Sequence, residues 1–554
     1  METVFFFRNI LLQIFFQGSF LYCKIRKLPS EFKIVPMNLI SNSTYLGELL
    51  TKGVFDKDLQ VLNLANHNKN KNLKKNYDQL KWLNTFSWLY TLSELNTQNS
   101  RDFAKNIIVL LDFAKNNFSP IIWDPEITGL RLCSICLNIN FLNLCKVFPN
   151  RRRMMSSIIF HVIYLFFSKV FVSKGLPSLR INAGFFFASL LLGETILKRH
   201  RILRNIVSDI LFLVKKKGEI ESRNPDELLE ILFLINRFIK FSSTSDLSRG
   251  KIEEKLKILQ NQIVPVLRGL RLGNGQLVRA NLCGGESIYW NLDKELYDAK
   301  PKDFSIRKNS MGFYRISAGR LKIIFDGQTK MIRKRTHNYF CSAFSFEVTS
   351  GQRTILQNNS PFNSFLGHSD NIFKVKREFN SVGFFKKNDQ LEPVWFSKIK
   401  EVNNYKNLNN NYLEGEKIIN IDDENVIHSR KLMIPFSGNE IIGSDLIFSE
   451  IPNIKFFDSI ILQFFVHPEV DVWNSEKSKY FLLKLKNNEI WRFETDQNNC
   501  KLDTYNYLDP KDLQTKKAFR IVLEKGFDGQ ELSVNWKFYL QNYTKKIARE
   551  KITL

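Results

Sequence analysis

The spacing of hydrophobic residues changes near residue 300, and this change constrains the fold more than any other feature of the chain. From about residue 82 to residue 267, apolar residues recur at every third or fourth position, in segments parted by glycine, proline, asparagine or charge clusters. This spacing is typical of amphipathic helices. After residue 300, apolar and polar residues alternate instead, as they do in strands with one buried face. The sequence therefore predicts a helical region followed by an antiparallel sheet region.

The helical region consists of about eight consecutive segments, among them RDFAKNIIVLLDFAKNN, INAGFFFASLLLGETI and PDELLEILFLINRFIKF. Helices joined by short turns fit an incomplete α/α toroid, and an α-solenoid fits the pattern nearly as well. The run HVIYLFFSKVFV, residues 161–172, is apolar enough to be compared with a membrane span. It holds only about a dozen residues, whereas a bilayer requires roughly twenty. We expect it to form a buried helix.

The sheet region carries strand-like runs such as LKIIF and FSFEV, separated by turn residues. The first turns are Ala318-Gly319, Asp326-Gly327 and Ser350-Gly351. Dipeptides of this kind close hairpins, so we expect an antiparallel β-sandwich. The predicted fold class is therefore α+β multidomain, with an N-terminal incomplete (α/α) toroid followed by an antiparallel β-sandwich. His428, with Arg430 and Lys431, is expected to form a basic strand edge.

The first 22 residues are rich in Phe, Leu and Ile but are interrupted by Glu2, Arg8, Gln13 and Gln17. The segment is too broken for a confident membrane span, and its basic residues follow the apolar part instead of preceding it as in an export signal. We expect an amphipathic helix with peripheral membrane contact through residues 1–28, and an export signal is the alternative. We divide the chain into a lead-in segment with a polar spacer at 1–78, a toroid at 79–295 and a sandwich at 300–545.

The chain is strongly basic, with 81 Lys and Arg residues against 55 Asp and Glu residues and a formal net charge of +26. This charge favours an anionic partner such as a polyanionic glycan, a nucleic acid or acidic lipid headgroups. A drift in composition toward lysine is the alternative explanation. No zinc finger, RNA-recognition signature, Walker loop or dinucleotide fingerprint occurs in the sequence. We therefore expect no nucleic acid partner and no nucleotide cofactor.

The seven cysteines are few for 554 residues and odd in number, so a disulfide framework is not predicted. Cys133 and Cys136 form a lone CxxC within an apolar, helix-like stretch. No second CxxC or nearby histidine pair completes a zinc site. We expect these cysteines on a buried helical face and predict no metal site.

Several motifs of the sheet region, GFYRISAGR, IIFDG, FSFEVTSGQR, FFVHPEV and WRFET, resemble the C-terminal domain of the heparinase II/III family, in the branch common in alphaproteobacteria. Upstream, WDPEITGLRL (123–132), SRNPDELLEILFLI (222–235) and LRGLRLGNGQL (267–277) are similar to that branch in order and spacing. The resemblance implies a toroid and a sandwich with a cleft between them. It also implies a polysaccharide lyase that cleaves uronic-acid glycans by β-elimination, with an anionic polysaccharide as partner.

β-Elimination requires one group that neutralises the C5 carboxylate of the substrate and others that carry protons. On the helical side, Ser222, Arg223 and Asn224 precede Pro225, which begins a helix whose positive end attracts a carboxylate. The alternative is an ordinary helix cap. By the same resemblance, Arg131 is expected among the substrate-binding residues.

On the sandwich side, the sequence departs from the family pattern. The histidine that precedes the FSFEV-type strand in the family falls on Phe340, and the nearest histidine, His337, lies three residues earlier. The histidine position before the next strand falls near Asn371, and His368 again lies early. These departures raise the alternative that the chain binds an anionic glycan without turnover.

The family tyrosine before the first core strand falls on Phe313, with Tyr314 beside it. The resemblance therefore leaves four candidates for catalytic proton transfer, namely His337, Tyr339, Tyr314 and His368. The substrates of the family favour the cell envelope or periplasm. Few cysteines and the broken N-terminal segment favour the cytoplasmic membrane face instead.

Overall fold

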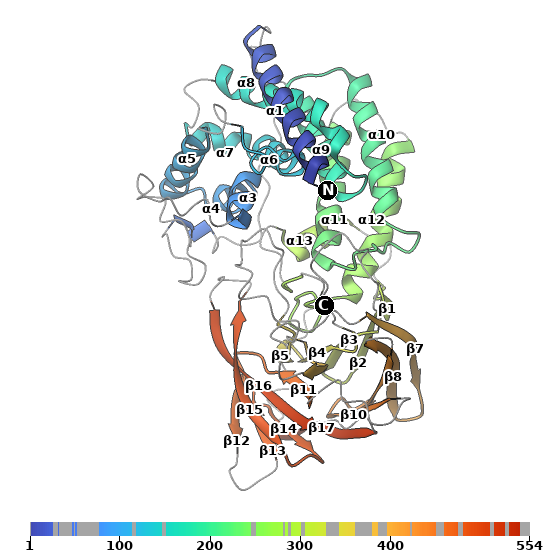
Figure 1. Ribbon diagram of the computed structural model, residues 1–554. Coiled ribbons are helices and arrows are strands. Elements are labelled where there is room, and N and C mark those ends of the chain that lie inside the picture. Colours follow the sequence, from blue (N-terminus) through green and yellow to red (C-terminus); the bar gives the residue numbers. More distant parts are fainter. Residues whose placement is uncertain are drawn as a thin grey trace.

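The computed structural model describes residues 2–25, 32, 47–48, 50–51, 77–112, 118–146, 151–244, 251–280, 283–285, 290–300, 305–327, 343–359, 379–385, 396–421, 424–449, 459–474, 480–509, 515–526 and 531–542. Within these residues the helices precede the strands, and the two kinds of element form separate regions of the molecule (Figure 1). The predicted order of the regions is confirmed. The change from helix to strand falls between residues 298 and 309.

The helical elements of the described residues are α1 (Glu2–Ile25), α3 (Tyr77–Thr85), α4 (Leu89–Leu95), α5 (Gln98–Asp112), α6 (Pro125–Leu137), α7 (Ile139–Leu144), α8 (Arg151–Ser168), η5 (Lys169–Phe171), α9 (Leu176–Leu191), α10 (Ile196–Leu213), α11 (Pro225–Thr244), α12 (Lys251–Gly269) and α13 (Leu292–Asp298). Local sequence sets several of their starts. At α6, for example, the side chain of Asp124 accepts a hydrogen bond from the backbone N–H of Glu126, and Pro125 occupies the first turn.

Helices α6 and α9 pack closely because glycine lies at their contact. A Cβ atom on Gly129 would lie 2.8 Å from Cγ1 of Ile181, and one on Gly184 would lie 3.1 Å from the carbonyl oxygen of Gly129. A larger side chain at either position would push the helices apart. Cys133 and Cys136 are buried on α6.

Helix α8 continues into η5, and the window Arg152–Phe171 is the one stretch of the described helices long and apolar enough to cross a membrane, with a mean hydropathy of 1.7. Length and composition alone do not distinguish such a span from a core helix. In this structure 56% of the window is buried, and α8 contacts α1, α6 and α9. The helix therefore packs against three others, but the prediction of a buried helix for residues 161–172 is met only in part, because Phe166, Phe167 and Val170 are exposed.

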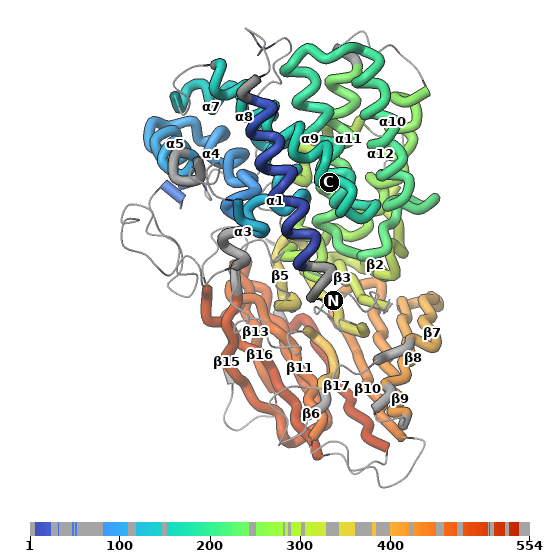
Figure 2. Tube along the Cα trace, turned by 45° about the horizontal axis from the view of Figure 1, so that its top comes forward, coloured from blue at the N-terminus to red at the C-terminus, as the bar shows by residue number. Residues whose placement is uncertain are grey.

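Helix α1 lies along α8 on the outside of the helical region (Figure 2). Leu12 and Phe16 are buried, and the ring of Phe15 stacks on that of Phe167 with 5.7 Å between centroids. Arg8 forms a 2.8 Å ion pair with Asp124, the cap of α6. One face of α1 is thus part of the helical core. Membrane contact by this segment remains a prediction.

The strands of the described residues are β1 (Asn309–Ser310), β2 (Phe313–Ala318), β3 (Leu321–Asp326), β4 (Phe346–Ser350), β5 (Arg353–Leu356), β6 (Val382–Phe385), β7 (Phe396–Lys406), β8 (Asn410–Ile421), β9 (Glu424–Pro435), β10 (Glu440–Ser449), β11 (Ser459–Phe465), β12 (Asp471–Asn474), β13 (Tyr480–Lys484), β14 (Ile490–Thr495), β15 (Cys500–Leu508), β16 (Thr515–Gly526) and β17 (Leu532–Asn542). They form a five-stranded sheet, β1-β2-β3-β4-β5, an eight-stranded sheet, β12-β13-β14-β17-β10-β9-β8-β7, and a four-stranded sheet, β15-β16-β11-β6.

All strand pairings recorded for the described residues are antiparallel, and two of the predicted hairpin turns are confirmed. Strand β2 returns as β3 through Gly319, and β4 returns as β5 through Gly351. Both glycines have positive φ, +50° and +55°, a conformation that disfavours residues with a Cβ atom.

The β2–β3 hairpin contributes to two hydrophobic cores at once. Phe313 and Ile324 belong to the core of the helical region. Ile316, Ile323 and Phe325 belong to the core between the sheets. Because successive residues of a strand point to opposite faces, the hairpin lies as a layer between the helices and the sandwich.

The prediction of a basic strand edge at 428–431 is wrong. Strand β9 pairs with β8 on one side and β10 on the other, so it is an interior strand. His428 and Arg430 point into the sandwich and are fully buried, whereas the side chain of Lys431 points outward and is 61% exposed. The alternation of a strand, together with burial of one face, explains the difference.

Candidate functional site

Helix α11 begins at the boundary between the two regions, and its first residues form a network of caps. Oδ1 of Asn224 accepts hydrogen bonds from the backbone N–H groups of Asp226, at 2.8 Å, and Glu227, at 3.4 Å. The hydroxyl of Ser222 donates to the carboxylate of Glu227. Pro225 is the first helical residue. Asn224 is therefore the N-cap of α11, as one of the two sequence interpretations expects.

The cap leaves the other half of the Asn224 amide unused. Among the described residues no acceptor is recorded for its Nδ2 atom. The two N–H bonds of this amide therefore remain available to a ligand at the positive end of α11. One residue can serve both as a cap and as a carboxylate ligand.

Arg223 joins the helical region to the five-stranded sheet. Its Nε donates to the carbonyl of Met311 at 2.7 Å, and its Nη2 pairs with the carboxylate of Asp326 at the end of β3. The guanidinium carbon lies 4.5 Å from the centre of the Phe313 ring. Arg223 and Asp326 are almost fully buried. The pair therefore holds the two regions together, and a substrate carboxylate at Arg223 remains a prediction.

Tyr314 lies on the opposite face of β2 from these groups. It packs against the core of the sandwich, whereas its neighbour Phe313 packs against the helical core under Arg223. The structure therefore does not bring Tyr314 to Arg223. The other hypothesised proton carriers, His337, Tyr339 and His368, lie outside the described residues, as do the departures at Phe340 and Asn371. Their roles remain predictions.

Arg131 is buried among neutral groups inside the helical region. Its Nε donates to Nε2 of His161 at 3.0 Å, and its Nη1 donates to Oδ1 of Asn84 at 3.2 Å. The guanidinium lies 4.5 Å from the ring centre of Trp123. Burial lowers the pKa of Arg131 to about 9. The structure does not bring Arg131 to Arg223 or Asn224 through any recorded contact among the described residues, and its substrate contact stays a prediction.

Sequence reasoning missed two acids near the start of α11. Burial raises the pKa of the Asp226 carboxyl to about 7, although the N–H of Gly284 and the side chain of Cys283 act in the opposite direction. Burial also raises the pKa of Glu347, on β4, to about 8. Glu347 accepts hydrogen bonds from the backbone N–H groups of Arg279, at 3.2 Å, and Asn358, at 2.9 Å.

The two acids belong to one electrostatic cluster, because both act on the thiol of Cys283. Burial raises the pKa of this thiol, the negative charges of Asp226 and Glu347 raise it further, and the positive charge of Arg279 lowers it. The three residues that act on Cys283 come from α11, from the segment before α13 and from β4. Perturbed acids gathered from several elements are typical of functional sites. A hint in the sequence is that Glu347 interrupts an apolar strand.

The cluster extends to the four-stranded sheet through an arginine–tyrosine contact. The guanidinium of Arg279 lies 4.4 Å from the ring centre of Tyr507, whose hydroxyl donates to Oε1 of Gln357 at 3.0 Å. The ring of His467 lies 5.4 Å from that of Tyr507. Burial, followed by the charge of Arg279, lowers the pKa of His467 to about 4. His467 is therefore neutral at physiological pH.

We define the junction cluster as Asn224, Asp226, Glu347, Arg279 and Tyr507. It combines an amide donor at a helix end, two acids that titrate near neutral pH, a cation and a phenol. Arg279, Glu347 and Tyr507 are fully buried, so these three would act on an anion at the end of α11 electrostatically and not by contact. Among the described residues, no group of three or more His, Cys, Asp or Glu side chains is arranged to hold a metal ion.

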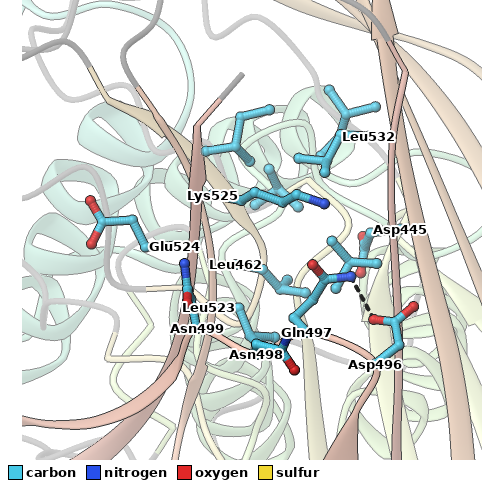
Figure 3. Close-up of a pocket in the computed structure, with 14 residues that line it drawn as sticks. Asp445, Leu462, Asp496, Gln497, Asn498, Asn499, Leu523, Glu524, Lys525 and Leu532 are labelled. Carbon is cyan, nitrogen blue, oxygen red and sulfur yellow. Dashed lines mark hydrogen bonds between the residues drawn. The ribbon is translucent and has the colours of Figure 1, made fainter. Parts of the chain in front are cut away.

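A pocket of about 280 Å³ lies elsewhere, between the eight-stranded and four-stranded sheets (Figure 3). Its polar lining includes Asp445 and Asp496. Asp445 is bonded to His428, Arg430 and Trp536, and Asp496 accepts from the N–H of Asn535. These acids are satisfied within the sandwich, so we take the junction cluster as the better candidate site.

Comparison with known proteins agrees with this architecture. Residues 419–537 match the family model described as Heparinase II/III-like, C-terminal. None of the curated proteins compared with the chain matches it. The match in sequence therefore covers the later strands of the sandwich and leaves the helical region to be compared by structure.

Several solved structures match almost the whole chain. The crystal structure of Heparinase III has a TM-score of 0.63 at 10% identity, over 97% of this chain and 92% of that one. A mutant of the heparan sulfate lyase HepC from Pedobacter heparinus has a TM-score of 0.54 at 12% identity, over 97% of this chain and 89% of that one. The predicted toroid and sandwich are thereby confirmed. The chain has the fold of heparinase III, and its residues 419–537 match the heparinase II/III-like C-terminal family model.

Proposed function

We propose that the protein cleaves an acidic, uronic-acid polysaccharide by β-elimination at the junction cluster. The observation that carries this proposal is the Asn224 amide at the positive end of α11, for whose Nδ2 no acceptor is recorded among the described residues, in a cluster with two acids whose pKa values are raised to about 7 and about 8. β-Elimination needs a donor that neutralises the substrate carboxylate, so that the neighbouring C–H becomes acidic. Asn224 supplies this donor, and His337, Tyr339 and His368 are the hypothesised proton carriers, whereas Tyr314 packs against the sandwich core.

The raised pKa values of Asp226 and Glu347 suit an anionic substrate. Because burial raises these pKa values to about 7 and about 8, Glu347 is mostly protonated at neutral pH and Asp226 is partly so. The cluster then carries less negative charge, and Arg279 contributes a positive one. As the pH rises from about 6 to about 9, both acids ionise, and we expect glycan binding to weaken through repulsion.

The test is the ultraviolet absorbance of the unsaturated uronate that β-elimination produces. We would incubate the full chain with heparan sulfate, chondroitin sulfate and a uronic-acid homopolymer. Asn224→Asp keeps a good N-cap but replaces the amide donor with a second negative charge. We expect it to lower kcat/KM by about 100-fold or more without changing the unfolding temperature. The absence of product from every one of these glycans would contradict the lyase proposal.

A second candidate is a glycan-binding protein without turnover. The observation that favours it is the engagement of Arg223 with Asp326, which leaves this guanidinium already paired. This candidate predicts that the chain is retained on a column of immobilised anionic glycan and that the glycan gains no unsaturated ends. Retention should decrease in Asn224→Asp. Product formation by the wild-type chain would exclude it.

A further inference from the structure

Helix α1 is apolar on the face that points away from the protein as well as on the face that packs. Its packed face buries Leu12 and Phe16. The opposite face exposes Phe7 (65%), Ile10 (38%), Leu11 (39%), Ile14 (56%), Leu21 (59%) and Tyr22 (50%). At about 100° per residue, these six side chains fall within an arc of about 120°. They form one continuous stripe along the outside of the helix.

The stripe continues onto the end of α8. The stacked rings of Phe15 and Phe167 connect the two helices. Beyond Phe167, which is 45% exposed, Phe166 and Val170 are 58% and 72% exposed. We call this set the α1–α8 apolar surface, made of Phe7, Ile10, Leu11, Ile14, Leu21, Tyr22, Phe166, Phe167 and Val170. Single exposed hydrophobic residues are ordinary on soluble proteins, but a contiguous set on two neighbouring helices marks an interaction site.

The charges around this surface are basic. Neither residues 6–23 nor residues 152–171 contain an Asp or a Glu. Arg152, Arg153 and Lys169 are exposed on α8 and η5, and the amine of Lys169 lies 5.0 Å from the ring centre of Phe166. The 554 residues together carry a net charge of +26. This combination attracts anionic headgroups, whereas a second copy of the same basic chain would be repelled.

We propose that the α1–α8 apolar surface docks onto a bilayer that contains anionic lipid. Helix α1 lies in the plane of the interface, with Phe7, Ile14 and Leu21 at the level where headgroups meet acyl chains. Lys169 extends along Phe166 and keeps its amine among the phosphates. Because α1 is on the outside of the helical region (Figure 2), this orientation keeps the protein on the membrane surface, and nothing in it requires α8 to cross the bilayer.

The experiment is co-sedimentation of the full chain with vesicles of phosphatidylcholine alone or with phosphatidylserine added. We expect the chain to pellet with the vesicles that contain phosphatidylserine and to be released by raised salt. Two aspartates in the stripe, Phe7→Asp with Ile14→Asp, should lower partitioning by about tenfold or more. Both positions are exposed, so the unfolding temperature should not change.

The matched control places two aspartates at exposed apolar positions of the sheet region, Leu408→Asp with Trp473→Asp, which are 95% and 46% exposed. This variant should pellet like the wild type. The proposal is overturned if the wild type does not pellet with phosphatidylserine vesicles, or if the stripe variant pellets equally well. Light scattering that shows a dimer which the stripe variant dissociates, without vesicle binding, would assign the surface to a second copy instead.

Discussion

The sheet region holds two buried acids whose pKa values are shifted in opposite directions. The pKa of Asp445 is lowered, and that of Glu347 is raised. Burial alone would raise the pKa of both. Arg430 and His428 outweigh it at Asp445, whose pKa is held well below its usual range. Glu347 receives backbone N–H bonds from Arg279 and Asn358, and its pKa rises to about 8.

The opposite pKa shifts distinguish a buried acid that stabilises the fold from one that can exchange protons. Asp445 has a cation in direct contact, with Arg430 Nε 2.7 Å from Oδ1, so it stays ionised and acts as a fixed part of the sandwich. Among the described residues no ion pair is formed by Glu347; the charge of Arg279 lowers its pKa, but burial outweighs that charge and raises the pKa to about 8. The first arrangement is typical of a structural pair and the second of a functional site.

The largest effect should come from removing the cation beside Asp445. Arg430→Ala leaves this carboxylate buried without its partner, and we expect it to lower the free energy of unfolding by roughly 3–5 kcal/mol. The measurement is denaturation by urea, followed by circular dichroism. A loss below about 1 kcal/mol would mean that Asp445 becomes protonated at little cost, and the contrast with Glu347 would then disappear.

The next effect concerns pH. The folded-state pKa of Glu347, about 8, is above its ordinary value of 4.5, so folding takes up a proton between these values. The contribution of Glu347 to the free energy of unfolding is complete below about pH 4.5 and is lost as the pH rises toward about 8. The free energy of unfolding then falls by up to about 1.4 kcal/mol per pH unit. Glu347→Gln should flatten the stability of the protein between about pH 5 and pH 8.

The control for this pH series is Glu524→Gln. The hydrogen bond from Lys501 lowers the pKa of Glu524, so its contribution changes only at acidic pH. This variant should keep the wild-type slope above about pH 5. Equal slopes for wild type and Glu347→Gln would show that Glu347 is already ionised at neutral pH.

A smaller effect is expected at Asn224, the amide of the junction cluster. Asn224→Ala removes the cap of α11 and should lower the free energy of unfolding by about 1 kcal/mol, whereas Asn224→Asp should change it by a few tenths. Urea denaturation of both variants measures the difference. If both variants lose stability equally, the amide has a structural partner other than the helix end.

The smallest effect should come from an exposed ion pair. Lys400 lies 2.7 Å from Glu416 on neighbouring strands, and the Lys400 side chain is 60% exposed. Lys400→Ala should change stability by less than about 1 kcal/mol, and less still at high salt. A loss as large as that of Arg430→Ala would show that burial does not explain the difference between the pairs.

The sequence predicts the fold well because periodicity is a local property. The repeats of the helical segments and the alternation around Ile323 and Val348 are visible in the chain itself, and so is the cap at Asn224. The position of β9 inside its sheet is set by pairing with β8 and β10, which its own residues do not encode. For this reason the sequence alone predicts an edge position for His428.

The candidate site was less predictable for the same physical reason. Asp226 and Glu347 are far apart in the sequence, and their pKa values depend on burial that only the packed chain creates. Likewise, the register of β2 decides that Phe313 faces the helices and Tyr314 faces the sandwich. A motif can identify the residue type at such a position, but it does not tell which face of the strand the side chain points to.

The β2–β3 hairpin has a consequence for cooperativity. Its two faces are shared between the helical core and the sandwich core, and Arg223 fastens its end to α11. If either the helical region or the sandwich unfolds, one face of the β2–β3 hairpin loses its packing partners. Heating should therefore give a single transition instead of two.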